Sequence, residues 1–406
     1  MTKTLSLAFG AFALSLHAAY EPADWNLKAR EEFAGFKFGV FIHWGLYADY
    51  AQGEWYLMSN NGEKSWKESL DEEAYSRMRD GFCPSKFDAA EWVRIIKDAG
   101  AKYLTITSRH HDGFSLWPTE VDDGYNIANT PFKRDILGEL SKACGEAGLQ
   151  LNFYYSLMDW HRGDYPPGRC AKSVKIERKP DYASYKKFML GQIGELIDRY
   201  HPGNIWFDGE WEHAEFDEKT KTWKRTLDWD FDTIYDFIHS KKTLVANNNH
   251  QPIREKEDIQ LFERNLPGEK GEGFSDNQPR VNTRPVEQCD VIQKNVWGYR
   301  IGETDFRTPE DVATMIVKCA ARNVNLLMNV GPDGSGRFPR RAVEVLAEVG
   351  KWMRANGEAI YATTAGPIQE PDRVSTRKGD KVYVFRLENG KYPVLENNVN
   401  RAVGGR

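Results

Sequence analysis

The sequence predicts an α/β protein built on a (β/α)8-like TIM barrel, because short apolar segments alternate with longer amphipathic ones. Several of the short segments are apolar on both faces, as parallel strands covered by helices should be. About seven of them precede residue 335, which favours a closed barrel over an open doubly wound sheet. The expected strands are Phe38–Trp44, Tyr103–Ser108, Leu151–Ser156, Asn204–Asp208, Thr243–Asn247, Ile259–Glu263 and Asn325–Val330.

Helices are expected between these strands. The segment Asp88–Ala99 has Asp88 and Glu91 in the spacing of a capping box and ends at Gly100. A second segment, Pro309–Arg322, opens with the residue that is enriched at the first helical position. The other expected helices are Arg134–Ala147, Tyr182–Tyr200, Asp230–His239 and Arg340–Asn356.

The N-terminal residues 1–19 have the pattern of an export signal. Lys3 supplies positive charge, Leu5–Leu16 is an apolar run, and Ala18 and Ala19 are small residues for cleavage. The run is too short for a membrane span, which needs about 20 residues. We therefore expect a catalytic domain of residues 20–361 that lies in the periplasm or outside the cell.

The pattern changes after Tyr361. The segment Asp380–Leu387 alternates polar and apolar residues, as a half-exposed strand does. Residues 362–406 are therefore expected to form a short, incomplete β-rich appendage, because a full β-sandwich needs about 100 residues.

Composition excludes several classes of function. The 406 residues carry a net charge of −5, which argues against nucleic acid or an anionic membrane as the main partner. No glycine-rich phosphate motif follows a strand, so nucleotide binding has no support. Five scattered cysteines have no metal-site spacing: Cys83, Cys144, Cys170, Cys289 and Cys319. The oligomeric state stays open.

The strongest candidate for a functional residue is Asp208, at the end of an apolar strand and before Gly209. Catalytic groups occupy that end of the strands in parallel barrels. An acid there is also a common turn former or helix N-cap. Other strands, however, carry polar or aromatic residues at the same end, in the segments His43–Trp44, Arg109–Phe114, Tyr154–Ser156, Asp159–His161 and Glu263–Arg264. This recurrence favours a site.

The mixture of side chains at the strand ends suits a sugar. Imidazole, carboxylate and indole N–H groups bind hydroxyls, while aromatic faces cover C–H patches. A histidine-rich set could instead bind zinc, but the adjacent His110 and His111 would point to opposite faces of a strand. We expect neither a metal nor another cofactor.

Hydrolysis of a glycosidic bond with retention needs two carboxyl groups, one as nucleophile and one as acid and then base. Asp208 suits the nucleophile by its position. Glu263 is well placed as the partner, and Glu287 competes with it. Glu54 and Glu210 fit substrate contacts or supporting residues better.

The chain resembles the family 29 glycoside hydrolases, the retaining α-L-fucosidases, over about residues 36–362. The matching segments are Lys37–Gly45, Glu54–Tyr56, His110–Phe114, Tyr154–His161, Trp206–Gly209, Trp297–Tyr299, Asn325–Pro332 and Asn356–Tyr361. The resemblance implies a (β/α) barrel followed by a β-sandwich, no metal requirement, and action outside the cytoplasm.

The resemblance also implies roles for individual residues. Asp208 is the implied nucleophile. The implied acid/base is Glu263 if the chain follows bacterial members, or Glu287 if it follows animal members; we favour Glu263. The implied fucose contacts are His43, Glu54, Trp55, His110, His111, Tyr155 and Trp206.

The chain departs from the family in the segment Asn247–His250. Many members have Asn-Asp-Arg-Trp there, and the arginine touches fucose. We expect Asn249 or His250 to replace that arginine.

The predicted function is therefore that of an exo-acting retaining α-L-fucosidase. It would release terminal fucose from oligosaccharide or glycoprotein glycans by double displacement. A barrel glycosidase for another sugar, such as an α-L-galactoside, and an inactive fucose-binding pseudoenzyme are the alternatives. The linkage and the natural glycan stay open.

Overall fold

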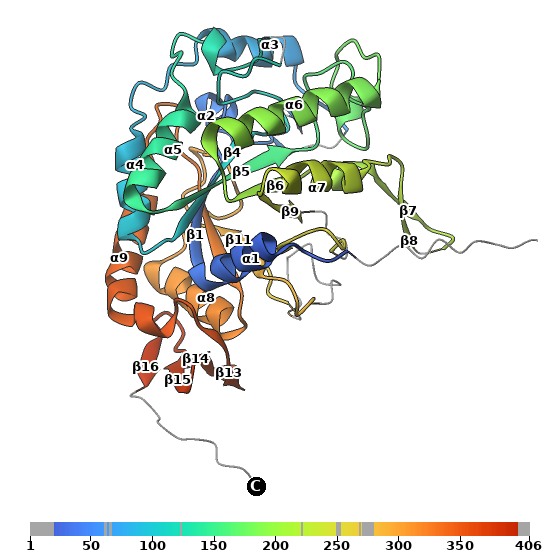
Figure 1. The fold of residues 1–406 in the computed structure, drawn as a ribbon. Helices are drawn as coiled ribbons and strands as arrows, with labels where there is room; N and C mark the ends of the chain where they lie inside the picture. Colours follow the sequence, from blue (N-terminus) through green and yellow to red (C-terminus); the bar gives the residue numbers. More distant parts are fainter. Residues whose placement is uncertain are drawn as a thin grey trace, which may run out of the picture.

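Eight parallel strands form the barrel of the computed structural model (Figure 1). The structure describes residues 20–60, 63–64, 67–121, 124–220, 222–248, 253–267, 269 and 280–396. The strand order is β10-β11-β12-β1-β4-β5-β6-β9, and a parallel bridge between Ala246 and Ile259 joins β9 to β10. This bridge closes the sheet into a barrel, as the sequence predicts.

Seven of the eight barrel strands lie where the sequence predicts them. The strands are β1 Phe38–Ile42, β4 Tyr103–Arg109, β5 Gln150–Ser156, β6 Asn204–Asp208, β9 Leu244–Asn248, β10 Gln260–Glu263, β11 Val286–Val291 and β12 Asn325–Val330. The sequence does not predict β11, because polar residues interrupt its apolar pattern.

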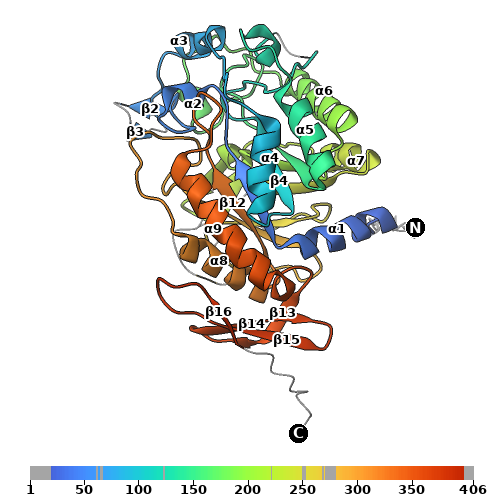
Figure 2. The same cartoon turned by 90° about the vertical axis from the view of Figure 1, so that its left-hand side faces the viewer.

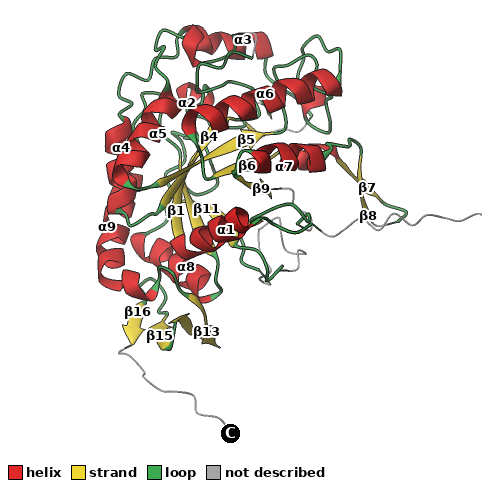
Figure 3. Cartoon of the chain, in the orientation of Figure 1, coloured by secondary structure: helices red, strands yellow, loops and turns green. Residues whose placement is uncertain are grey.

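Helices cover the outer face of the barrel (Figures 2 and 3). They are α4 Ala89–Asp98, α5 Ile136–Ala147, α6 Tyr182–Tyr200, α7 Phe231–Ser240, α8 Pro309–Ala321 and α9 Arg340–Asn356. Helix α1 Asp24–Phe36 instead packs Phe33 against residues that point into the barrel, such as Phe41 and Tyr103. The Asp88 carboxylate accepts a hydrogen bond from the Glu91 backbone N–H, and Thr308 and Asp311 form a capping box at α8. Only α1 lacks a counterpart among the expected helices.

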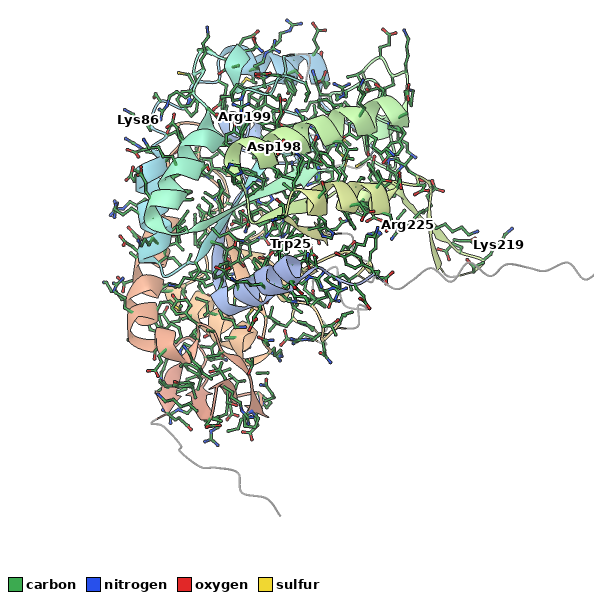
Figure 4. The ribbon with its side chains drawn as sticks, viewed as in Figure 1. Trp25, Lys86, Asp198, Arg199, Lys219 and Arg225 are labelled. Atoms are coloured by element: carbon green, nitrogen blue, oxygen red, sulfur yellow. The ribbon has the colours of Figure 1, made fainter. Side chains whose placement is uncertain are left out.

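The loops between the barrel strands and helices contain short elements. Two are helices, α2 Tyr47–Tyr50 and α3 Glu72–Ser76, and five are 3₁₀ turns: Arg77–Asp80, Ile127–Asn129, Ala171–Ser173, Glu210–His213 and Gly357–Ala359. β2 Ser59–Asn60 pairs with β3 Glu63–Lys64. β7 Ala214–Asp217 and β8 Thr222–Arg225 form a hairpin that projects from the barrel beyond Arg225, with Lys219 near its tip (Figure 4).

A small antiparallel sheet follows the barrel. Its strands are β13 Thr364–Gln369, β14 Arg373–Lys378, β15 Lys381–Arg386 and β16 Val394–Glu396. It lies at the opposite end of the molecule from α2 and α3 (Figure 2). The Thr376 hydroxyl donates to the Ala359 carbonyl, and the Trp352 indole N–H donates to the Pro393 carbonyl. The expected β-rich appendage is thus packed on the barrel.

Two apolar layers hold the barrel together. The inner layer includes Phe41, Tyr154, Trp206 and Ala246, and the outer layer lies between the strands and their helices. Successive residues of a strand point into different layers. The alternation decides which side chains can reach a site at the barrel mouth.

Several expectations concern residues outside those described. They are the export signal in residues 1–19, the replacement of an arginine by Asn249 or His250, and the end of the chain from residue 397. Of the helices among the described residues, none is long and apolar enough to cross a membrane. All five cysteines are free thiols, and Cys83 alone among them is exposed.

Candidate active site

Asp208 ends β6 at the mouth of the barrel, and its side chain is 13% exposed. The Tyr154 hydroxyl donates to Asp208 Oδ2 at 3.0 Å, and the Trp211 indole N–H donates to Oδ1 at 3.1 Å. His111 Nε2 lies 3.5 Å from Oδ2. Gly209, at φ +95°, makes the turn that brings Trp211 back over the carboxylate. These donors stabilise and orient a charged carboxylate.

Glu263 ends β10, on the other side of β9 from Asp208. Between them, the Asn248 amide nitrogen donates to Glu263 Oε2 at 3.0 Å and lies 3.5 Å from Asp208 Oδ1. The two carboxylate oxygens are therefore at most about 6.5 Å apart. Retaining glycosidases hold their carboxyl groups about 5–5.5 Å apart, and inverting enzymes about 6.5–9.5 Å. The upper limit includes the spacing of retaining enzymes and lies at the lower end of the inverting range.

Glu287 lies inside the barrel, below the mouth. In the register it pairs with Leu261, two residues before Glu263. The Tyr103 hydroxyl donates to its Oε2 at 2.6 Å, and the Trp206 indole N–H donates to its Oε1 at 2.8 Å. Burial raises the pKa of the Glu287 carboxyl to about 7, although both hydrogen bonds lower it. Both Glu287 oxygens are therefore hydrogen-bonded to side chains inside the barrel.

His43 is a neutral imidazole with a defined tautomer. Burial lowers its pKa to about 3. Asn329 donates its amide N–H to the Trp297 carbonyl, so its Oδ1 faces His43 Nδ1, 2.7 Å away. Since an amide oxygen only accepts, Nδ1 carries the proton and Nε2 is an acceptor. A hydroxyl donor of a ligand matches Nε2.

His110 and His111 lie on the same side of the barrel mouth. Their ring centroids are 4.2 Å apart, and His110 stacks on Tyr154 at 5.4 Å. The expectation that they point to opposite faces is wrong, because β4 ends at Arg109 and both residues lie in the turn beyond it. Within the described residues, no group of three His, Cys, Asp or Glu side chains could hold a metal ion.

Glu54 and Trp55 belong to the wall of the mouth. Glu54 Oε2 accepts hydrogen bonds from the backbone N–H groups of Trp297 and Gly298, at 3.2 and 2.8 Å. It thereby ties the loop after β1 to the loop after β11. The Trp55 ring stacks on Trp211 at 5.9 Å, which gives the site a flat aromatic side.

The structure does not bring Tyr155 to the mouth. Its hydroxyl donates to Gln192 of α6 at 2.8 Å, and its side chain is fully buried between sheet and helix. Its neighbour Tyr154 faces Asp208 instead. The expectation that Tyr155 contacts fucose is therefore wrong. The alternation along β5 indicates this placement, because Leu151, Phe153 and Tyr155 lie on the same apolar face of the strand.

Three further residues of the mouth were not predicted as site residues. Asn248 bridges the carboxylates, Trp211 donates to Asp208, and Trp297 packs on His43 at 5.1 Å. Trp206, which the sequence does predict, lies deeper, stacked on Tyr154 at 5.6 Å.

Comparison with known proteins identifies the family. A family model described as alpha-L-fucosidase matches residues 11–358. The chain belongs to the α-L-fucosidase family. The tissue alpha-L-fucosidase of Bos taurus is 30% identical over 399 residues, covering 93% of this chain and 79% of that protein.

Solved α-L-fucosidases share the fold. Isoenzyme 1 from Paenibacillus thiaminolyticus is 32% identical, with a TM-score of 0.73 over 90% of this chain and 85% of that one. A GH29 enzyme from Bacteroides thetaiotaomicron, trapped as a covalent intermediate with 2-fluoro-fucosyl fluoride, is 28% identical. Its TM-score is 0.71 over 92% of this chain and 84% of that one.

Proposed function

We propose that Asp208 is the nucleophile and Glu263 the acid/base of this exo-acting retaining α-L-fucosidase. One observation carries the assignment: a single amide nitrogen, that of Asn248, lies within 3.5 Å of both carboxylates. Glu287 lacks this placement, because Tyr103 and Trp206 hold both of its oxygens inside the barrel.

The reaction proceeds in two displacements. In the first, an Asp208 oxygen bonds to the anomeric carbon of fucose while the glycosidic bond breaks and Glu263 gives its proton to the leaving oxygen. In the second, Glu263 takes a proton from water, whose oxygen attacks the anomeric carbon and expels the Asp208 carboxylate. Glu263 is then protonated again, and free fucose leaves with its configuration retained.

The walls of the site account for recognition of the sugar. The paired rings of Trp55 and Trp211 offer a flat surface to C–H groups, and His43 Nε2 offers an acceptor to a hydroxyl. His110, His111 and Glu54 complete the polar side. The substrate is a terminal fucose on an oligosaccharide or glycoprotein glycan.

Release of nitrophenol from 4-nitrophenyl α-L-fucoside tests the two roles. Asp208→Ala should lower kcat by at least ~10³-fold, because no other group forms the covalent ester. Azide should restore activity to Glu263→Ala, since a small anion can replace water without a general base. The same rescue of Glu287→Ala, and not of Glu263→Ala, would reverse the assignment.

Export of the protein is also part of the proposal. The charged and apolar pattern of residues 1–19 supports cleavage before Tyr20 and a periplasmic or extracellular enzyme. Fractionation of the producing cell and N-terminal sequencing test this. A protein in the cytoplasm that still begins with Met1 would refute it.

A further inference from the structure

Asn248 lies at the junction of three strands. In the register of β6 and β9 it is the partner of Asp208, and β10, which ends in Glu263, lies on the other side of β9. Its side chain is 5% exposed. The last residue of β9 therefore faces the gap between the two carboxylates.

The orientation of the Asn248 amide follows from its neighbours. Ionised carboxylate oxygens only accept hydrogen bonds, so the amide nitrogen rather than the oxygen must face them. Its two hydrogens serve two acceptors, Glu263 Oε2 at 3.0 Å and, with a longer contact, Asp208 Oδ1 at 3.5 Å. A neutral donor adds no charge to the pair.

We propose that Asn248 is a positioning residue that sets which oxygen of Glu263 carries the catalytic proton. Because Glu263 Oε2 accepts from the amide, the proton of the acid form resides on Oε1. Deprotonated Glu263, which acts on water in the second displacement, keeps the same bond. The inference rests on the proposed roles of Asp208 and Glu263.

A shared donor also reduces repulsion between two negative charges held this close. Titratable groups that face the pair include His111 and Tyr154 at Asp208, and Cys289, which is the register partner of Glu263 and interacts electrostatically with both carboxylates. The Asn248 amide nitrogen lies within 3.5 Å of both carboxylates and donates to each. Loss of the amide should therefore affect both displacements.

The test compares two truncations one residue apart. Asn248→Ala should lower kcat by roughly 10- to 100-fold, less than the ~10²–10⁴-fold effect of an acid/base group. Both limbs of its kcat/KM pH profile should move to higher pH. Asn247→Ala is the matched control, because the Asn247 amide donates to Glu210 and Tyr235 on the outer face of β9.

Asn248→Asp keeps the size of the side chain and remains informative if Asn248→Ala does not fold. It removes the amide donor and places a third carboxylate beside the pair, so both limbs of the kcat/KM pH profile should lie at higher pH than in the wild type. The inference would be overturned if a folded Asn248 variant had the kcat of the wild type and the same kcat/KM pH profile. Asp208→Ala, assayed in parallel, separates the two failures: if that variant keeps its activity, the proposed function itself has failed.

Discussion

At the scale of single residues, position along a strand decides function. Tyr154 and Tyr155 are chemically identical neighbours on β5. The hydroxyl of Tyr154 donates to Asp208, and that of Tyr155 donates to Gln192 behind the sheet. The first hydrogen bond orients the reacting carboxylate, and the second holds α6 against the sheet.

Removal of each hydroxyl should separate these two roles. Tyr154→Phe removes one of the donors to Asp208 and should lower kcat/KM for the aryl fucoside by roughly 10-fold. Tyr155→Phe should leave kcat/KM unchanged and lower the free energy of unfolding by about 0.5–1.5 kcal/mol. Steady-state kinetics and urea unfolding measure both. Equal losses of activity in the two variants would contradict the assignment.

Glu287 supports the site from below, because it holds the Trp206 ring on which Tyr154 stacks. Its pKa in the folded protein, about 7, lies above the ordinary value of 4.5. A raised carboxyl pKa stabilises the fold below the unfolded pKa, and this contribution is lost as the pH rises through the folded pKa.

We therefore predict that the wild type loses stability relative to Glu287→Gln between about pH 4.5 and pH 7. Urea unfolding at a series of pH values measures the difference. Glu348→Gln, which removes a carboxyl from an exposed position on α9, is the control. If the curves of wild type and Glu287→Gln run parallel over this range, the buried carboxyl is not protonated as described.

At the scale of elements, Asp258 anchors α1 to the seam of the barrel. The carboxylate accepts hydrogen bonds from Asn26 at 2.8 Å, from Arg30 Nε at 3.1 Å, from His239 at 2.9 Å and from the Val245 N–H at 2.7 Å. Burial raises the Asp258 pKa, but the hydrogen bond and charge of His239 and the charge of Arg30 outweigh it, so the pKa is lowered. One side chain thus joins α1, α7 and β9.

Asp258→Ala should destabilise the protein by about 3–5 kcal/mol, because it leaves the buried Arg30 without its ion-pair partner. The control is Asp98→Ala, which removes an exposed ion pair with Arg94 and should cost about 0–1 kcal/mol. Urea unfolding compares the two variants. Similar losses would show that Asp258 does not anchor the helix.

The barrel strand β11 and the helix α1, both missed by sequence analysis, share a physical cause. In β11, Glu287, Gln288 and Asp290 break the apolar pattern, yet partners from other elements satisfy all three. In α1, Asn26 and Arg30 are buried because Asp258 pairs with them. A polar residue can be buried when a partner distant in the sequence forms a hydrogen bond or ion pair with it. Hydrophobic periodicity does not detect such residues.

At the scale of the whole molecule, the C-terminal sheet completes the core beneath α8 and α9. Phe385 of β15 is fully buried, with its ring 6.2 Å from that of Trp352 on α9. The sheet lies at the end of the molecule away from α2 and α3 (Figure 1). We assign the sheet a role in stability rather than in catalysis.

Phe385→Ala should lower the free energy of unfolding by about 3–5 kcal/mol, because it opens a cavity in this packing. The kcat/KM of the folded fraction should stay at the wild-type value. Val394→Ala, in the same sheet but 45% exposed, is the control. A loss of kcat/KM without a loss of stability would place the sheet in the catalytic machinery.

The features that can be predicted from the sequence are those with a local pattern. The barrel, seven of its strands and the group of side chains at the strand ends follow from periodicity and the motifs of the family. The roles of Tyr154 and Asn248 do not, since they depend on how β5, β6, β9 and β10 align. Register between distant strands is set by packing across the whole barrel.

Trapping of the covalent intermediate tests whether Asp208 is the nucleophile. The enzyme should be incubated with 2-fluoro-fucosyl fluoride, digested and analysed by mass spectrometry of its peptides. We predict one added 2-fluoro-fucosyl group on Asp208, with none on the Asp208→Ala variant. A label on another carboxylate, or turnover of fucoside without any labelled enzyme, would contradict the role of Asp208.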